Sequence, residues 1–306
     1  MKSKIVVIGS SNVDLIMKMN HLPVKGETVT NAEFFQVYGG KGANQAVAAA
    51  RAGGNVAFIN CVGEDAYTPQ MVRNYNNDGI NTRFVFHEKG MASGHALIMI
   101  GQTGENIISV APGANYLLTP DKIDEALPVI EDAAMIVMQY EIQEETIKYV
   151  IDLANKKGIP VMWNCAPARA LDLSYIPKIN ILVLNEVEAG FLAGMTVENE
   201  SDAEKAAQKL VDSGVEKVII TLGSKGAFVV TKTEKVSIPA FKVEAVDTTA
   251  AGDTFCGAYA VALVEGKSLK DALQFASAAA AISVTRMGAQ PSAPNRLEID
   301  EFLKNY

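Results

Sequence analysis

The chain has 306 residues, 49% hydrophobic and 20% charged, and this length accommodates one large α/β domain or a domain with an appendage. The net charge of −8 argues against a nucleic-acid surface, and no apolar stretch is long enough to span a membrane. Cys61, Cys165 and Cys256 lie far apart, so neither a disulfide framework nor a cysteine metal site is indicated, and we expect a cytoplasmic protein.

Short apolar runs alternate with helical patterns along the chain. Strands are expected at 4–9 and 56–62, on either side of an alanine-rich helix at 43–52. This alternation predicts a three-layer α/β/α domain over residues 1–306, with a mostly parallel sheet covered by helices on both faces. The other elements of the pattern are strands at 134–139, 160–164, 181–184 and 217–221, and helices at 144–157 and 201–212.

Two regions, 15–38 and 83–110, break this alternation. They lack helical periodicity and carry short alternating runs punctuated by glycines. Both follow strands of the main sheet, and open α/β sheets bind their ligands at the carboxyl ends of strands. We therefore expect a small β-sheet lid over the site, with a β-meander that only packs as the alternative.

Polar side chains follow several of the predicted strands. Asn12 and Asp14 alternate after the first strand, point to the same side and suit a vicinal diol, although an Asx turn is a common alternative. Glu141 follows another strand. Asn185 and Glu188 share one face of a first helical turn and could hold magnesium-bound water, but a solvated helix start explains Glu188 equally well.

Two glycine-rich segments carry lysines. In Gly39-Gly40-Lys41-Gly42-Ala43-Asn44 the lysine is followed by glycine, so the segment is no Walker loop, and the chain holds no GxGxxG motif. Lys41 and Asn44 offer the polar groups that a polyhydroxylated ligand needs, with a turn and helix cap as the alternative. Thr221-Leu222-Gly223-Ser224-Lys225-Gly226 suits a nucleotide phosphate or a hairpin.

The segment 247–257, DTTAAGDTFCG, is the most informative part of the chain. Ala250, Ala251 and Gly252 lead into Asp253 at the start of an apolar helix, where unpaired N–H groups attract anions. A carboxylate placed there can take a proton from a substrate hydroxyl, so an anion cradle and a general base predict phosphoryl transfer. The alternative is an Asp253 that only caps the helix.

Two of these segments resemble the signatures of the ribokinase-type sugar kinases: GGKGANQAVAAARAG at 39–53 and DTTAAGDTFCGAYA at 247–260. The resemblance covers nearly the whole chain. It implies ATP-dependent phosphorylation of D-ribose at the 5-hydroxyl, with Mg²⁺ and K⁺ as cofactors and a homodimer formed through the lid. The alternatives are a kinase of the same fold acting on deoxyribose, fructose or a keto-sugar acid, and a non-catalytic sugar or nucleotide sensor.

The resemblance also implies roles for individual residues. Asp253 would be the base, and the backbone of Ala250, Ala251 and Gly252 would hold the transferred phosphoryl group. The sugar would be bound by Asn12, Asp14, Gly40, Lys41, Gly42, Ala43, Asn44, Glu141 and Asp253. ATP would lie along Asn185, Thr221, Leu222, Gly223, Ser224, Lys225, Gly226, Gly252, Asp253 and Ser277, the last at a position where the family often has histidine. Potassium would be surrounded by Asp247, Thr249, Ser283, Arg286, Gly288 and Ser292, with Glu188 near magnesium.

Overall fold

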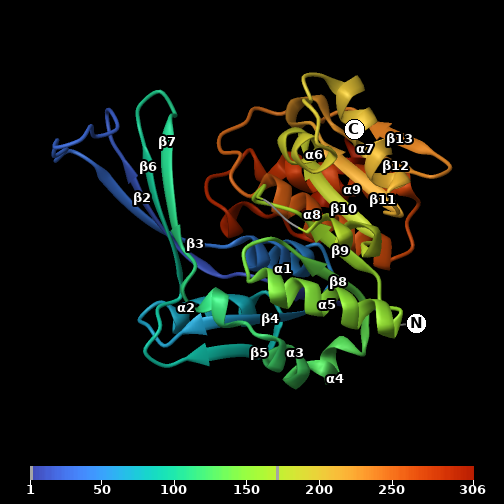
Figure 1. The fold of residues 1–306 in the computed structure, drawn as a ribbon. Coiled ribbons are helices and arrows are strands. Elements are labelled where there is room, and N and C mark those ends of the chain that lie inside the picture. Colours follow the sequence, from blue (N-terminus) through green and yellow to red (C-terminus); the bar gives the residue numbers. More distant parts are fainter. Residues whose placement is uncertain (1–2, 170–171) are drawn as a thin grey trace.

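A nine-stranded sheet lies between two layers of helices (Figure 1). The computed structural model describes residues 3–169 and 172–306, and residues 1–2 and 170–171 of the expected domain lie outside these ranges. From β5 to β11 all neighbouring strands are parallel, and β12 and β13 add an antiparallel edge. The predicted α/β/α architecture is therefore confirmed. In spatial order the strands are β13 (Lys235–Ile238), β12 (Ala227–Thr231), β11 (Lys217–Thr221), β10 (Ile181–Asn185), β9 (Val161–Asn164), β8 (Ala133–Met138), β1 (Lys4–Ile8), β4 (Asn55–Gly63) and β5 (Asn81–Glu88).

The side chains of this sheet alternate between two hydrophobic cores. In β1, Ile5 and Val7 point into one core and Val6 and Ile8 into the other, and all four are buried. A strand covered on both faces needs such a continuous apolar run. One core is closed by α1 (Lys41–Arg51), α2 (Thr68–Asn77), α8 (Ala251–Val264), α9 (Leu269–Ser283) and α10 (Arg296–Lys304), and the other by α3 (Pro120–Glu125), α4 (Leu127–Ile130), α5 (Glu144–Lys157), α6 (Glu186–Ala193) and α7 (Glu200–Asp212).

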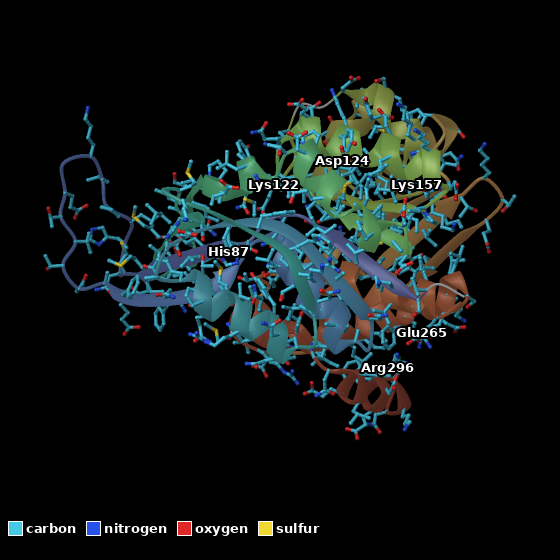
Figure 2. The ribbon with its side chains drawn as sticks, turned by 90° about the horizontal axis from the view of Figure 1, so that it is seen from below. His87, Lys122, Asp124, Lys157, Glu265 and Arg296 are labelled. Atoms are coloured by element: carbon cyan, nitrogen blue, oxygen red, sulfur yellow. The ribbon has the colours of Figure 1, made fainter. Side chains whose placement is uncertain are left out.

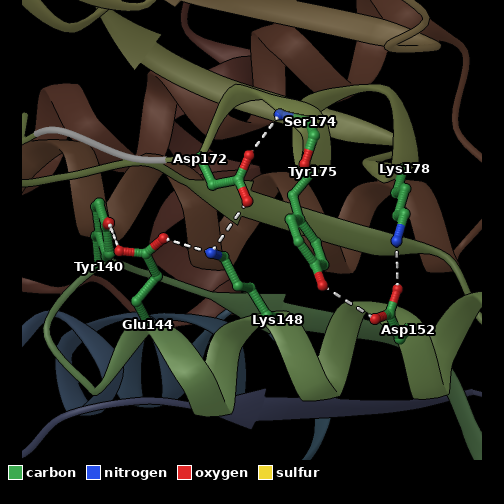
Figure 3. Close-up of polar contacts among 8 residues, drawn as sticks. All are labelled: Tyr140, Glu144, Lys148, Asp152, Asp172, Ser174, Tyr175 and Lys178. Atoms are coloured by element: carbon green, nitrogen blue, oxygen red, sulfur yellow. Dashed lines mark hydrogen bonds and ion pairs between the residues drawn. The ribbon is translucent and has the colours of Figure 1, made fainter.

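A row of ion pairs and hydrogen bonds runs along the outer surface of α5 (Figure 3). Lys148 lies 2.9 Å from Glu144 on its own helix and 3.2 Å from Asp172, which precedes the 3-10 helix η2 (Leu173–Lys178). One turn further on, Asp152 accepts hydrogen bonds from Tyr175 and Lys178. These contacts hold η2 against α5 on the surface of this layer.

Helices α1 and α8, which carry the two signature segments, cross at close range. A methyl group on Gly257 of α8 would lie 2.7 Å from the Cβ of Ala48 and from the backbone nitrogen of Ala49, so only glycine fits there. In Figure 2, Arg296 of α10 lies beside Glu265, the residue after α8, and its guanidinium also donates to the carbonyl oxygen of Ala52 after α1. Arg296 thereby links the C-terminal ends of α1 and α8.

A second, four-stranded sheet projects from the main body at one side (Figure 1). We call it the small sheet. Strands β2 and β6 at its centre are parallel, and both outer pairs are antiparallel. In spatial order its strands are β3 (Glu33–Gly39), β2 (Asn12–Lys18), β6 (Gly94–Ile100) and β7 (Asn106–Ala111).

The small sheet differs in extent from the expected segments 15–38 and 83–110. Its first strand already begins at Asn12, and its second part begins at Gly94. Residues 83–88 belong to β5 instead, which pairs with β4 at the edge of the main sheet. The reason is packing, since Phe84 and Phe86 of β5 lie against the core of the α5 side.

The remaining short elements are 3-10 turns, and none of the described helices is both apolar and long enough to cross a membrane. Cys61, Cys165 and Cys256 are buried and unpaired. The 3-10 turns besides η2 are η1 (Gly113–Leu117), η3 (Gly223–Lys225) and η4 (Gln290–Ser292).

Candidate active site

The first turns of α1 and α8 meet around Asp253. This carboxylate is buried, with 6% of its surface exposed, and each of its oxygens accepts one hydrogen bond from α1. Asn44 Nδ2 donates to Oδ2 at 2.9 Å, and Gln45 Nε2 donates to Oδ1 at 2.9 Å. The alternative, in which Asp253 only caps the helix, is wrong, because Ala250 is the N-cap residue and Asp253 lies in the first turn.

The backbone before Asp253 leaves two amides free at the positive end of α8. Ala250 adopts a left-handed conformation, with φ 58°, which is uncommon for a non-glycine residue. The N–H groups of Gly252 and Asp253 have no acceptor within the described part of the chain, whereas that of Thr254 donates to the Ala250 carbonyl oxygen at 2.8 Å. Gly252 is exposed, and a methyl group added to it would meet nothing within 4 Å. Free amides at a helix start bind anions.

The glycine-rich turn before α1 packs directly against the connection between β1 and β2. A methyl group on Gly42 would lie 2.4 Å from the backbone nitrogen of Ser10, so this close approach requires glycine. Glu141 fixes the same turn from the end of β8, because its Oε2 accepts from Lys41 N at 2.9 Å and from Ser10 Oγ at 2.6 Å. The predicted sugar residues Gly40, Lys41, Gly42, Ala43, Asn44 and Glu141 are thus brought together with Asp253.

Strand β2 contributes Asn12 and Asp14, which are buried on one face of the small sheet. The Oδ1 atom of Asn12 accepts from Asn115 Nδ2 at 2.8 Å, which leaves the amide hydrogens of Asn12 for a ligand. The carboxylate of Asp14 has no hydrogen-bond partner within the described ranges. Because a sugar hydroxyl both donates and accepts, this pair of groups suits a diol.

The site concentrates negative charge around one lysine. Burial raises the pKa of Asp14 to about 7, and the neighbouring charges of Glu141 and Asp253 add to this effect. Burial also raises the pKa of Asp253, while the Lys41 ammonium and the two amide hydrogen bonds oppose the shift. Burial on its own would lower the pKa of Lys41, but the surrounding carboxylates outweigh it and raise the pKa. Lys41 therefore stays protonated between acidic groups.

The predicted nucleotide residues lie at the ends of β10 and β11. Asn185 ends β10, is paired in register with Thr221, and forms a reciprocal capping box with Glu188. Glu188 is buried rather than solvated as the alternative had it, and burial raises the pKa of its carboxyl. Gly223, Ser224 and Lys225 form η3, and Leu222 N donates to Gly226 O at 2.8 Å in the hairpin between β11 and β12. Ser277 lies partly exposed on α9, which packs against β12 and β13.

The predicted potassium residues lie on two segments that run side by side. The Asp247 carboxylate accepts from Thr249 N and Gly288 N, both at 2.9 Å. Burial on its own would raise the pKa of Asp247, but these hydrogen bonds outweigh the effect of burial and lower the pKa. Ser283 and Ser292 are buried near the same loop, whereas the guanidinium of Arg286 pairs with Glu298 of α10.

Several polar residues of the site were not anticipated from the sequence. Ser10 holds Glu141, Asn115 holds Asn12, and Gln45 holds Asp253. Gln45 follows Asn44 in the first signature and stands out as a polar residue in an alanine-rich helix. That contrast was the available signal, because a glutamine inside an apolar helix face needs a buried partner.

The model of the pfkB family of carbohydrate kinases matches residues 2–296. The ribokinase of Haemophilus influenzae is 41% identical over 305 residues, covering 100% of both chains, and a deoxyribokinase of Salmonella typhi is 41% identical over 300 residues, covering 98% of both. The structure of Arabidopsis thaliana ribokinase complexed with ribose and ATP superimposes with a TM-score of 0.93 at 34% identity, covering 99% of both chains. The chain belongs to the pfkB family of carbohydrate kinases.

Proposed function

We propose that the protein transfers the γ-phosphoryl group of ATP to the 5-hydroxyl of D-ribose and releases ribose 5-phosphate and ADP. The observation that carries this proposal is the buried Asp253 beside the free amides of Gly252 and Asp253 at the start of α8. The similarity to ribokinases along the whole chain supports ribose as the acceptor.

In the proposed mechanism Asp253 is the general base. The ribose O–H bond breaks and its proton goes to Asp253, while the oxygen bonds to the γ-phosphorus and the bond to ADP breaks. The free amides of Gly252 and Asp253 stabilise the charge of the transferred group. Asn12, Asp14, Lys41, Asn44 and Glu141 orient the sugar, which converts the reaction into transfer between positioned groups.

Phosphoryl transfer from ATP implies a divalent cation such as Mg²⁺, which neutralises charge on the phosphates. Glu188 suits a place near it, because its carboxylate is buried toward the site and one of its oxygens is free of the capping box. For potassium we propose Asp247, Thr249, Ser283, Arg286, Gly288 and Ser292, largely through backbone oxygens. Bound K⁺ would supply positive charge beside the loop that leads into α8. The close approach of the two segments supports this choice.

A homodimer through the small sheet is part of the proposal. Both faces of this sheet carry large apolar side chains that are 43–60% exposed: Phe34, Leu97 and Ile107 on one face and Phe35, Ile108 and Val110 on the other. Apolar surface of this kind marks an interaction site. We expect Leu97→Glu to shift the protein from dimer to monomer in analytical ultracentrifugation, and an unchanged mass would contradict the dimer.

We also propose a cytoplasmic location, since ATP is the co-substrate and the three cysteines are unpaired.

The second candidate is the same reaction on 2-deoxyribose, because deoxyribokinases are as similar to this chain as the ribokinase of Haemophilus influenzae. One experiment separates the candidates: ADP production from MgATP with D-ribose, 2-deoxyribose, fructose or adenosine, each with and without KCl. Ribose-dependent turnover that rises with potassium would support the acceptor and the cation site together. Preference for another acceptor would replace ribose, and sugar binding without turnover on any acceptor would favour the sensor.

A further inference from the structure

Gln45 is a buried glutamine in α1 that is followed by small and apolar side chains. It has no exposed surface, and its buried neighbours in α1 include Ala46, Val47 and Ala48. Burial of an amide costs free energy unless its polar atoms are hydrogen-bonded, so an apolar residue would be the simpler choice here. The side chain therefore has a use other than packing.

The amide of Gln45 connects three separate elements. Its Nε2 donates to Asp253 Oδ1 at 2.9 Å and to Asn164 Oδ1 at 3.1 Å, at the end of β9. Its Oε1 accepts from Gln139 Nε2 at 2.7 Å, directly after β8. Asn164 is in turn held by the carbonyl oxygen of Val183 in β10. Because its oxygen is engaged by Gln139, the NH₂ group of Gln45 must face the carboxylate.

We propose that Gln45 is a positioning residue for the general base, holding the Asp253 carboxylate oriented and ionised, and that Gln139 holds Gln45 in turn. This inference rests on the proposed function. A donor hydrogen bond favours the ionised form, which is the form that accepts a proton. The other donor to Asp253 is Asn44, which we assign to the sugar. Gln45 is not assigned to the sugar, so its hydrogen bond holds the base whether or not sugar is bound.

Other titratable groups lie around Asp253, and they come from several elements. They are unchanged in a Gln45 variant, so the difference between variant and wild type isolates the amide. These groups are Lys41 on α1, Asp14 on β2, Glu141 after β8, Glu188 on α6 and Cys256 on α8.

The test is Gln45→Met, which keeps the length of the side chain and removes its hydrogen bonds. We expect kcat to fall 10- to 100-fold, with the KM for ribose changed less than threefold. The acid limb of the kcat profile should move upward by about one to two pH units, since a hydrogen bond to a charged group has that strength. A loss of kcat that is equal at every pH would indicate a merely structural role and overturn the inference.

The matched control is Thr146→Val in α5, which also removes a buried hydrogen bond, to the Leu118 carbonyl oxygen at 2.6 Å. This variant should keep the wild-type pH profile. A shift equal to that of Gln45→Met would mean that the loss of any buried hydrogen bond moves the pH profile. It would contradict the assignment of Gln45 as the positioning residue for Asp253.

A second measurement needs no sugar. In protein carrying ¹³C-carboxyl aspartate, the Asp253 signal is assigned by its loss in Asp253→Asn, and its titration should lie at higher pH in Gln45→Met than in wild type. An unchanged titration overturns the inference even if wild type phosphorylates ribose, whereas absent turnover in wild type refutes only the proposed function. If Gln45→Met does not fold, Gln139→Met replaces it, with a smaller shift in the same direction expected and no shift contradicting the inference.

Discussion

The Nδ2 atom of Asn44 in α1 lies 2.9 Å from Oδ2 of Asp253 in α8, so the two signature segments meet in one hydrogen bond. The two residues are 209 positions apart in the chain. Their contact depends on the close crossing of the two helices at Gly257. A ligand that binds to Asn44 is therefore within reach of the base.

Removal of the base should slow the chemical step with little effect on ATP binding. General bases contribute roughly 10²- to 10⁴-fold, so Asp253→Ala should lower kcat by that factor, or about 3–5 kcal/mol of barrier. The KM for ATP should stay within threefold. Steady-state kinetics at saturating ribose measure both values, and a kcat change below about threefold would rule out Asp253 as the base.

Asp14→Asn should stabilise the free protein above neutral pH. The pKa of Asp14 is raised from 3.8 to about 7 in the folded state, so wild type loses stability as pH rises between these values, by up to about 4 kcal/mol. The variant should lack that loss and bind ribose poorly. Urea unfolding at pH 4 and pH 8 measures the difference in unfolding free energy between wild type and variant. The same difference at both pH values would contradict a raised pKa of Asp14 in the folded state.

Gly252→Ala should separate folding from catalysis. The added methyl group meets no atom within 4 Å, and the backbone of Gly252 is not in the left-handed region. We expect the stability to be unchanged or raised by about 0.5–1 kcal/mol, because alanine favours the helix. The same methyl group would stand where the phosphoryl group is held, so kcat should fall at least tenfold. Full activity in the variant would place the phosphoryl group elsewhere.

The Asp172 carboxylate should stabilise the protein at neutral pH but not in strong acid. Hydrogen bonds from Ser174, together with Lys148, lower its pKa from 3.8 to about 2. Since the folded pKa is the lower one, the contribution is present above about pH 4 and is lost as pH falls through 2. Thermal denaturation of Asp172→Asn should therefore differ from wild type at pH 5 and converge with it near pH 2. A constant difference at both values would show that the carboxylate charge is not responsible.

Local patterns in the sequence predicted six of the nine strands of the main sheet, and missed β12 and β13. The helix expected at 144–157 is α5 with the same bounds, and the expected strands lie within a residue or two of β1, β4, β8, β9, β10 and β11. These strands are covered on both faces and read as continuous apolar runs, and α5 buries one face, so both patterns are strong. Residues 83–88 of β5 were expected in the lid instead, because alternation alone does not tell which sheet an edge strand joins.

The candidate site could be predicted in part. Polar residues at the ends of strands indicated its position, since the carboxyl ends of parallel strands meet at one edge. The supporting contacts of Ser10, Asn115 and Gln45 could not be predicted, because their partners lie more than 100 positions away in the chain. Backbone oxygens, such as those we propose for potassium, also leave no pattern of side chains in a sequence, whereas the small residues 250–252 before an apolar helix did indicate the free amides of α8.

Strand β2 belongs to the small sheet along its whole length, and it carries Asp14 into a site whose base belongs to the main body. A sugar held between Asp14 and Asp253 would join the two parts of the molecule. Sugar affinity and the placement of the small sheet are then one linked equilibrium, and each changes the other by the same factor. A partner subunit that restrains the small sheet would thus tune the affinity for a sugar it never touches.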